Sequence, residues 1–284
     1  SMFSIIVCSI DPQNAQALRQ SIEATATIPF ELLLFDNREE GLGICQVYNQ
    51  CAERAKYDYL CFVHEDIIFH TRGWDKIIAD KLSEEGCGAI GFAGGTAKYP
   101  YLYGWQNISK FCQKHYLRGA KGKKPSLRTS RSKSEFSEVV TLDGMCLCVS
   151  RERWSKHRFD QKTFTGFHSY DTDFTTALFV AGYKNYVCNS VTLEHLSTGS
   201  FSKSWLESVK IYLDKWGSQL PLYVTSRHSA KEIERSSAAA EAFAIKKLIR
   251  NRLINSDEAR SLVANFRRRH PYSIHTIPLL LKLR

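Results

Sequence analysis

The sequence lacks several features that would assign the protein to a specialised class. It has no apolar run near the ~20 residues that a membrane-spanning helix requires, and it begins with no signal-peptide pattern. Its nine cysteines form no Cys-x-x-Cys pair and show no Cys/His spacing typical of zinc sites. Cys8, Cys61, Cys146, Cys148 and Cys188 lie inside apolar runs. We therefore expect a soluble cytoplasmic protein in which these five cysteines are reduced core residues.

Acidic residues are absent from one long segment, 109–134, which holds nine Lys/Arg. The C-terminal stretch 223–284 carries thirteen Lys/Arg against five acids. Because the whole chain has a net charge of +10 and these segments contribute +9 and +8, the remaining body carries −7. No basic face is built into the body, so the charge pattern argues against a nucleic-acid-binding main domain.

Length and composition indicate a globular α/β protein. The 284 residues are 43% hydrophobic and 12% aromatic, which excludes a largely disordered chain. We expect a main domain over 1–222 and a basic helical extension over 223–284. Segment 109–134, inside the main domain, is predicted to be a flexible basic loop.

The first 95 residues alternate strand and helix patterns. The predicted strands are 4–9, 30–35, 59–63 and 89–93, and the predicted helices are 14–24, 43–55 and 74–82. Strands that alternate with helices of this length indicate βαβ units and a largely parallel sheet.

Residues 96–137 break this alternation and are predicted to form a long loop. Beyond them the predicted strands are 139–149 and 186–193, the predicted helices are 169–181 and 203–215, and the tail over 229–266 is helical. A short apolar run, 277–281, closes the chain.

The most informative local feature is the abrupt end of the apolar run Tyr59–Val63. Three polar residues, His64, Glu65 and Asp66, follow it directly. In open α/β sheets ligands bind outside the carboxyl ends of the strands. Asp66 is therefore a candidate ligand for a metal or a phosphate-bound cation.

Other acidic and histidine side chains occupy similar positions. Asp36 ends the second strand, Asp171 opens the helix over 169–181, and His195 follows the strand over 186–193. The helix after Gly43 carries Tyr48-Asn49. In this order the motifs resemble those of the family 2 glycosyltransferases, over roughly residues 3–205. The chain looks most like the divergent bacterial subgroup related to the streptomycin-biosynthesis-type glycosyltransferase domain.

The resemblance implies the GT-A fold, a Rossmann-like and mostly parallel sheet flanked by helices. It also implies that Asp171 is the catalytic base. Asp66 and His195 would hold a divalent cation, Mn²⁺ or Mg²⁺, and Asp36 would contact the nucleoside of a nucleotide-sugar. The other residues expected to contact the nucleotide-sugar are Asn49, Glu65, Asp143, Gly144 and Trp105.

Two positions depart from the family pattern. His64 replaces the first Asp of the Asp-x-Asp motif, so Glu65 could contribute to the metal site in its place. Tyr170 replaces the Glu that commonly precedes the base. These departures keep open the alternative of a nucleotide-sugar or glycan-binding module without catalysis.

The residue types suit sugar transfer independently of the family. A departing nucleoside diphosphate gains negative charge, which a bound cation stabilises as a Lewis acid. Carboxylates bind hard cations, and Mn²⁺ also accepts imidazole. A positioned carboxylate that takes the acceptor proton is typically worth ~10²–10⁴-fold. With the family match, one base and one metal imply single displacement with inversion.

Several of these positions also have structural explanations. Asp171 and Asp173 can stabilise the positive end of a helix. Asp143-Gly144 can form a turn, and Trp105 with the neighbouring tyrosines can pack a loop instead of stacking on a sugar.

We therefore predict an inverting, metal-dependent hexosyltransferase of bacterial polysaccharide assembly. Its expected donor is a nucleotide-sugar, with UDP as the first choice, and its acceptor is a glycan or a lipid-linked saccharide. A sugar nucleotidyltransferase is less favoured, because Ser9–Pro12 lacks the Gly-rich opening of that family. The tail has three open explanations, namely a helical packing extension, an oligomer contact or a membrane-surface anchor. The run Arg267–Arg269 near 277–281 suits the third, as a peripheral contact with anionic lipid headgroups. No nucleic-acid partner is expected.

Overall fold

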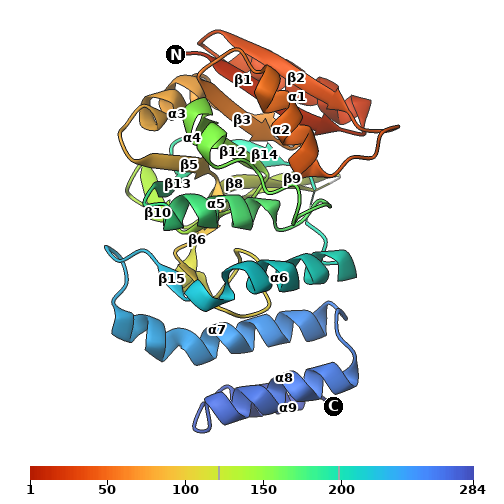
Figure 1. Ribbon diagram of the computed structural model, residues 1–284, viewed down its shortest axis with the longest axis vertical. Coiled ribbons are helices and arrows are strands. Elements are labelled where there is room, and N and C mark those ends of the chain that lie inside the picture. Colours follow the sequence, from red (N-terminus) through yellow and green to blue (C-terminus); the bar gives the residue numbers. More distant parts are fainter. Residues whose placement is uncertain (121, 198) are drawn as a thin grey trace.

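In the computed structural model, which describes residues 1–120, 122–197 and 199–284, a seven-stranded sheet occupies one end of the molecule (Figure 1). Lys121 of the basic segment and Thr198 lie outside the described residues. The strand order is β10-β13-β5-β12-β3-β1-β2. The strands are β1 (Phe3–Ser9), β2 (Phe30–Asp36), β3 (Tyr59–Val63), β5 (Cys87–Gly91), β10 (Phe136–Val139), β12 (Cys146–Ser150) and β13 (Lys184–Cys188).

The sheet is parallel in its N-terminal part and mixed elsewhere. β1 pairs in parallel with β2 and β3, and β13 pairs in parallel with β5. β12 runs antiparallel to both β3 and β5, and β10 runs antiparallel to β13. The largely parallel sheet predicted from the βαβ pattern therefore holds for the first three strands.

Helices cover both faces of this sheet because its central strands are apolar on both faces. Adjacent residues of β1 point into two different cores, Ile5 toward α1 and α3 and Ile6 toward α2 and α5. The helices are α1 (Pro12–Thr25), α2 (Ile44–Arg54), α3 (Trp74–Leu82), α4 (Arg151–Lys156), α5 (Tyr170–Val180) and α6 (Lys203–Trp216). Asp11 caps α1, accepting hydrogen bonds from the backbone N–H groups of Gln13 and Asn14.

A second sheet of six strands continues from the first, with the order β11-β6-β8-β14-β4 and with β9 paired to β8. Its strands are β4 (Ile67–Phe69), β6 (Ala93–Gly95), β8 (Cys112–Ala120), β9 (Lys123–Thr129), β11 (Thr141–Leu142) and β14 (Leu193–His195). The prediction of a flexible loop over 109–134 is wrong for most of this segment, which forms the antiparallel hairpin β8–β9. β8 becomes a strand because β6 and β14 pair with it on either side.

The C-terminal helices stack below α6 (Figure 1). They are α7 (Ala230–Arg250), α8 (Ser256–Arg269) and α9 (Thr276–Leu281). The predicted helical tail is thus divided in two, since Asn255 and Glu258 form a capping box at the start of α8. The described residues contain no helix long and apolar enough to cross a membrane.

An aromatic cluster joins α7 to the main domain. Tyr99, Tyr103 and Phe111 pack against Ile233 of α7, and the Tyr99 hydroxyl donates to the Ile233 carbonyl at 2.6 Å. At this cluster the short strands β7 (Ala97–Lys98) and β15 (Leu222–Tyr223) pair with each other. The chain also forms two 3-10 turns, η1 (Ser109–Phe111) just before β8 and η2 (Gly217–Gln219) just before β15. These tyrosines therefore pack a loop, the structural alternative to sugar stacking. The division into a main domain over 1–222 and a helical extension over 223–284 stays a prediction.

Candidate functional site

Two histidines and one aspartate meet where β3 and β14 end. His64 and Asp66 lie between β3 and β4, and His195 is the last residue of β14. Because β14 pairs with β4 and places His195 opposite Ile67, the chain brings His195 beside Asp66. One ligand atom from each of the three side chains lies within 4.8 Å of the others, and His195 Nε2 is 3.3 Å from Asp66 Oδ2.

The charges of this cluster suit a cation. Burial opposes ionisation of Asp66, but hydrogen bonds from His195 and Ser197 hold the pKa of its carboxyl well below the usual range. Burial lowers the pKa of His64, which keeps its imidazole neutral at neutral pH. Burial also works against charge on His195, yet the Asp66 carboxylate raises the pKa of that imidazole. An anionic carboxylate beside a neutral imidazole is the donor chemistry that a divalent transition metal needs.

Tyr170 contacts one of these three side chains, His64. Its hydroxyl lies 2.7 Å from His64 Nε2, and the side chain is buried at the first residue of α5. The two residues that depart from the family pattern are therefore in direct contact. A hydrogen bond to the second ring nitrogen sets the orientation of a metal-binding imidazole.

A pair of carboxylates lies next to this cluster. Asp143, in the turn between β11 and β12, accepts from Trp105 Nε1 at 2.8 Å and from the Met145 backbone N–H at 2.8 Å. Asp171 accepts from the Gly144 backbone N–H at 2.7 Å. Burial and the neighbouring charge of Asp143 raise the pKa of Asp171 to about 7. Asp171 can therefore exchange a proton near neutral pH, as a general base must.

Gly144 allows these groups to approach one another. A Cβ atom at this position would lie 2.2 Å from Tyr170 Oη and 3.2 Å from the Asp171 Cβ. The close contact between this turn and the start of α5 therefore requires glycine.

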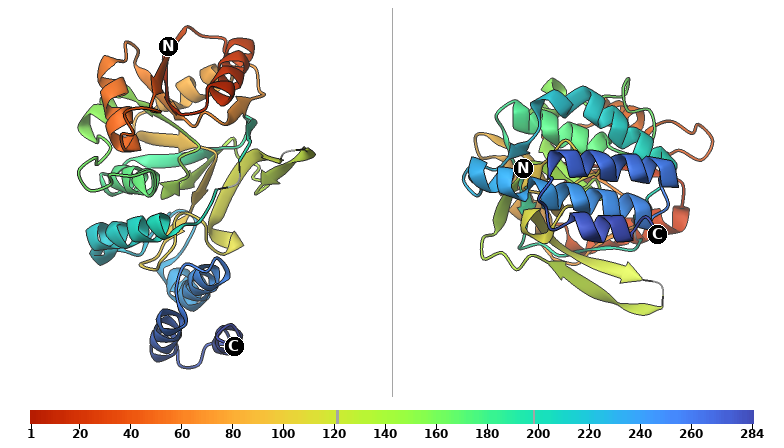
Figure 2. Two further views of the ribbon diagram at one scale, coloured as in Figure 1. Left: turned by 90° about the vertical axis from the view of Figure 1, so that its right-hand side faces the viewer. Right: turned by 90° about the horizontal axis from the view of Figure 1, so that it is seen from below.

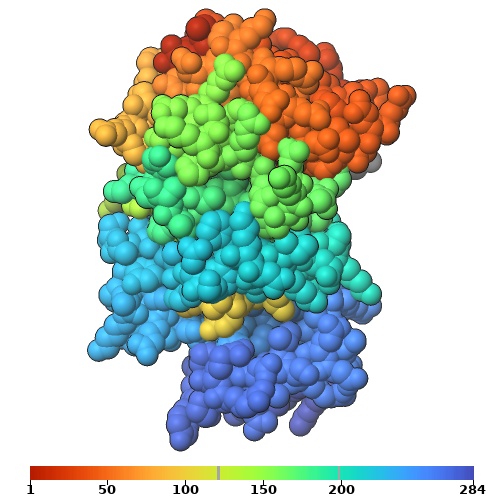
Figure 3. Space-filling model, in the orientation of Figure 1, coloured from red at the N-terminus to blue at the C-terminus, as the bar shows by residue number. Residues whose placement is uncertain are grey.

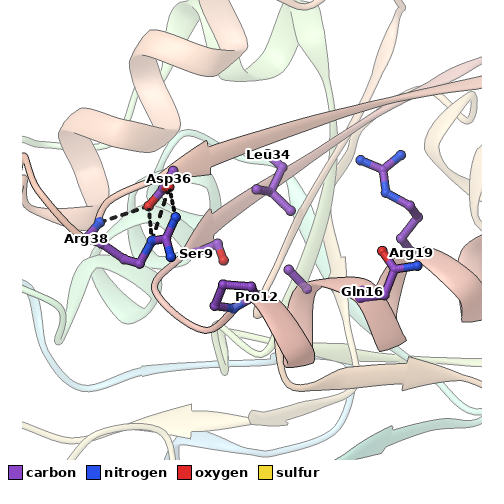
Figure 4. A pocket seen from close by; sticks show the side chains of 8 residues that line it. Ser9, Pro12, Gln16, Arg19, Leu34, Asp36 and Arg38 are labelled. Atoms are coloured by element: carbon purple, nitrogen blue, oxygen red, sulfur yellow. Dashed lines mark hydrogen bonds and ion pairs between the residues drawn. The ribbon is translucent and has the colours of Figure 1, made fainter.

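A pocket opens between the start of α1 and the end of β2 (Figure 4). It is lined by Ser9, Pro12, Ala15, Gln16, Arg19, Leu34, Asp36 and Arg38. The Arg38 guanidinium holds Asp36 in an ion pair at 2.6 Å, and its hydrogen bonds lower the pKa of Asp36 to about 2. Asp36 thus presents a permanent carboxylate at the strand end predicted for the nucleoside.

Glu65 lies outside the His64–Asp66–His195 cluster. Its carboxylate accepts from Ser9 Oγ at 2.6 Å and from the backbone N–H groups of Ile10 and Asp11. Glu65 therefore holds the turn between β1 and α1, which borders the pocket. This corrects the prediction that Glu65 could replace the missing Asp as a metal ligand, because its oxygens already serve that turn.

Asn49 and Trp105 also have structural partners. The buried Asn49 amide donates to the Phe159 carbonyl at 2.8 Å, and its oxygen accepts from Trp154 Nε1 at 3.1 Å. The structure thus places Asn49 in the packing between α2 and α4, which corrects its predicted contact with the nucleotide-sugar. Trp105 is only 9% exposed, and it positions Asp143 through its indole N–H instead of presenting a face to a sugar.

Sequence reasoning missed two contributors because neither has a recognisable pattern. Ser197 donates from Oγ to Asp66 Oδ2. Arg118 of β8 is the cross-strand neighbour of His195. Only the pairing of distant strands brings these side chains to the cluster.

The nine cysteines are all free. Of the five predicted to be reduced core residues, four are buried and Cys8 is half-buried. Cys61, Cys146 and Cys148 lie together in the core between the sheet and helices α1 and α3, with Cys61 Sγ 3.6 Å from Cys146 Sγ. They share this fully buried core with apolar side chains, so they act as small packing residues.

Comparison with known proteins gives a family and a fold. A model of the glycosyltransferase-like family matches residues 4–216. The structure of S. aureus TarS has a TM-score of 0.57 at 11% identity, covering 98% of this chain and 50% of TarS. TarS 1–349 in complex with UDP-GlcNAc has a TM-score of 0.57 at 12% identity, covering 94% of this chain and 80% of that one.

A third solved structure, GalNAc-T7 with UDP, GalNAc and Mn²⁺, has a TM-score of 0.50 at 12% identity. It covers 74% of this chain and 47% of GalNAc-T7. The chain thus spans about half the length of GalNAc-T7 and of the longer TarS structure. A search of curated proteins found no match. The solved structures confirm the predicted GT-A fold.

Proposed function

The chain belongs to the glycosyltransferase-like family, and we propose from this premise that it is an inverting, metal-dependent hexosyltransferase. Its donor is a nucleotide-sugar, with UDP as the expected nucleotide. Its acceptor is a hydroxyl of a glycan or lipid-linked saccharide in bacterial polysaccharide assembly. The observation that carries the proposal is the meeting of the His64–Asp66–His195 cluster with the Asp143–Asp171 pair through Tyr170. Membership of the streptomycin-biosynthesis-type subgroup remains a prediction.

His64, Asp66 and His195 would hold the cation. Two of the three donors are imidazoles, a set that favours Mn²⁺ over Mg²⁺, because Mg²⁺ prefers oxygen ligands. GalNAc-T7, of the same fold, was solved with Mn²⁺ and UDP, which supports this choice. Bound here, the cation would stabilise the negative charge that gathers on the departing diphosphate.

Asp171 acts on the opposite partner in the reaction. As the acceptor oxygen bonds to the anomeric carbon, the bond from that carbon to the phosphate oxygen breaks and its electron pair leaves with the nucleoside diphosphate. The acceptor proton passes to the Asp171 carboxylate, whose raised pKa of about 7 makes it an effective base. The negative charge of Asp143 helps to raise the pKa of Asp171. At the other end of the donor, Asp36 contacts the nucleoside.

An assay of nucleoside diphosphate release tests this function. Purified protein with Mn²⁺, a saccharide acceptor panel and UDP-, GDP- or dTDP-hexoses should release one nucleoside diphosphate. Asp171→Asn should lower the rate by ~10²–10⁴-fold, whereas Asp214→Asn, an exposed change on α6, should leave it unchanged. Release at the same rate from wild type and Asp171→Asn would contradict the assignment of the base.

We also propose that the C-terminal helices contact an anionic membrane surface from the cytoplasmic side. Tyr272, Ile274 and Ile277 are 97%, 84% and 69% exposed, and they follow the run Arg267–Arg269 at the end of α8. Apolar side chains beside arginines suit insertion among anionic headgroups.

A further inference from the structure

The antiparallel β8–β9 hairpin projects from the body (Figure 2, left). Arg118 of β8 is paired in register with His195 of β14, so both side chains lie on the same side of the sheet. Tyr116, two residues before Arg118, shares that side, and its cross-strand partner on β9 is Arg128. Burial raises the pKa of the Tyr116 phenol. The charge of Asp143 raises it further, and the charges of Arg118 and Arg128 lower it, so all three charged groups lie near this phenol. This face therefore begins at the site and extends outward along the hairpin.

The cations described in and just after the hairpin have no acidic partners among the described residues. Over residues 112–134 the described part of the chain carries Lys114, Arg118, Lys123, Lys124, Arg128, Arg131 and Lys133, and none of them forms an ion pair within the described residues. Lys123, Lys124 and Arg128 are exposed. A concentration of unpaired positive charge beside a catalytic site attracts anions.

We propose that the β8–β9 hairpin binds the acceptor and that this acceptor is a polyanionic saccharide chain, with repeated phosphodiester or carboxylate groups. This inference rests on the proposed transferase function. The cations begin at Lys114 on β8 and reach Lys123 on β9, which lies opposite Ala120 of β8. From residue 114 to residue 120, a strand is about 20 Å long. A single donor diphosphate, held at the metal cluster, cannot span such a row, whereas a polymer lying along the hairpin can.

The hairpin suits a charged polysaccharide better than a nucleic acid. Sequence-tolerant binding of single strands combines cations with aromatic side chains on which bases stack. Among residues 112–129, Tyr116 is the one Phe, Tyr or Trp, and it is half-buried against the core. The exposed outer part thus offers charge without a stacking surface.

Binding of fluorescent oligomers by the full chain tests the inference. The probes are a polyglycerol phosphate, a polygalacturonate, a neutral dextran and a single-stranded DNA of matched charge. The test variant is K123Q/K124Q/R128Q, and the matched control is K162Q/K231Q/R235Q, which removes the same charge from exposed positions elsewhere. Thermal stabilisation by UDP with Mn²⁺ is measured in parallel for each protein.

We expect the wild type to bind one or both polyanions. The hairpin variant should bind them about tenfold more weakly and with a smaller dependence on salt, whereas the control variant should bind like the wild type. Binding of the polyglycerol phosphate would identify phosphodiester groups on the acceptor, and binding of the polygalacturonate would identify carboxylate groups. Both variants should keep the wild-type response to UDP. Equal affinity in the two variants, binding of neither polyanion, or preference for the DNA would overturn the inference while leaving a normal UDP response, and the proposed function, intact. A wild type that binds polyanions without any UDP response would instead remove the transferase function and the acceptor role with it.

Discussion

At the scale of single residues, a direct contact joins His64 and Tyr170, the two residues that depart from the family pattern. A hydrogen bond to the second ring nitrogen orients an imidazole, and the Tyr170 hydroxyl lies 2.7 Å from His64 Nε2. The residues at the two departing positions, 64 and 170, are thus hydrogen-bonded to each other. This pairing favours a working metal site over a degenerate one.

Tyr170→Phe should weaken Mn²⁺ binding by about 10–100-fold, because it removes the group that orients His64. Calorimetric titration with Mn²⁺ measures this effect. Tyr272→Phe removes a hydroxyl from a side chain that is 97% exposed and should bind Mn²⁺ like the wild type. An unchanged Mn²⁺ affinity in Tyr170→Phe would show that the hydroxyl does not orient a ligand.

The rate of transfer should depend on pH through Asp171. Its pKa is raised to about 7, so below that pH the carboxyl is protonated and cannot accept the acceptor proton. We expect kcat/KM to fall about tenfold per pH unit on the acid side. Asp143→Asn removes a negative charge that raises this pKa, so the acid limb should move to lower pH. A limb that stays in place in Asp143→Asn would contradict the coupling of the two carboxylates.

The sequence was sufficient to place residues at strand ends but not to assign every side chain. Asp66 and His195 lie together because β14 pairs with β4, and Asp171 at the start of α5 accepts from the Gly144 backbone N–H in the turn before β12. Their roles in metal binding and catalysis stay predictions. The partners of Glu65 and Asn49 could not be predicted, since they come from segments distant in the chain. Their roles depend on tertiary contacts that leave no local pattern.

At the scale of elements, the N-terminal strands and helices were predictable because their apolar periodicity is strong. The helix over Trp74–Leu82 and the strand over Tyr59–Val63 have the predicted bounds. The predicted strand 139–149 is instead divided among β10, β11 and β12, around the turn that carries Asp143. The β8–β9 hairpin was missed because lysine-rich, serine-rich sequence disfavours a strand, and pairing with β6 and β14 overrides that preference.

The tip formed by the end of α8 and α9 should bind anionic membranes. Full-length protein is expected to cosediment with vesicles that contain phosphatidylglycerol and not with purely zwitterionic vesicles. Ile277→Glu should weaken binding by on the order of tenfold or more, since it places a charge at a side chain that would insert. Val180→Glu changes an apolar side chain that is 43% exposed at the end of α5 and should leave binding unchanged. Binding that is indifferent to lipid charge would contradict the proposed membrane contact.

At the scale of the whole molecule, the N-terminal residues lie at one end of the long axis and the C-terminal residues at the other (Figure 3). The candidate site lies in the sheet-bearing part, and α7 packs on the aromatic cluster at its base. This arrangement leaves the hairpin and the C-terminal tip as two separate basic surfaces. A transferase that takes its donor at the strand ends could therefore engage a polyanionic acceptor and a membrane with different parts of one chain.

The most direct test of the central claim is thermal unfolding with UDP, GDP, CDP or dTDP, each with and without Mn²⁺. We predict that one nucleotide, expected to be UDP, stabilises the protein only with Mn²⁺, by ~2.7 kcal/mol at 100 times its Kd. Asp66→Ala should abolish this response, whereas Asp257→Ala, at an exposed position on α8, should retain it. Stabilisation by no nucleotide, or stabilisation that needs neither Mn²⁺ nor Asp66, would contradict a metal-dependent nucleotide-sugar site at the His64–Asp66–His195 cluster.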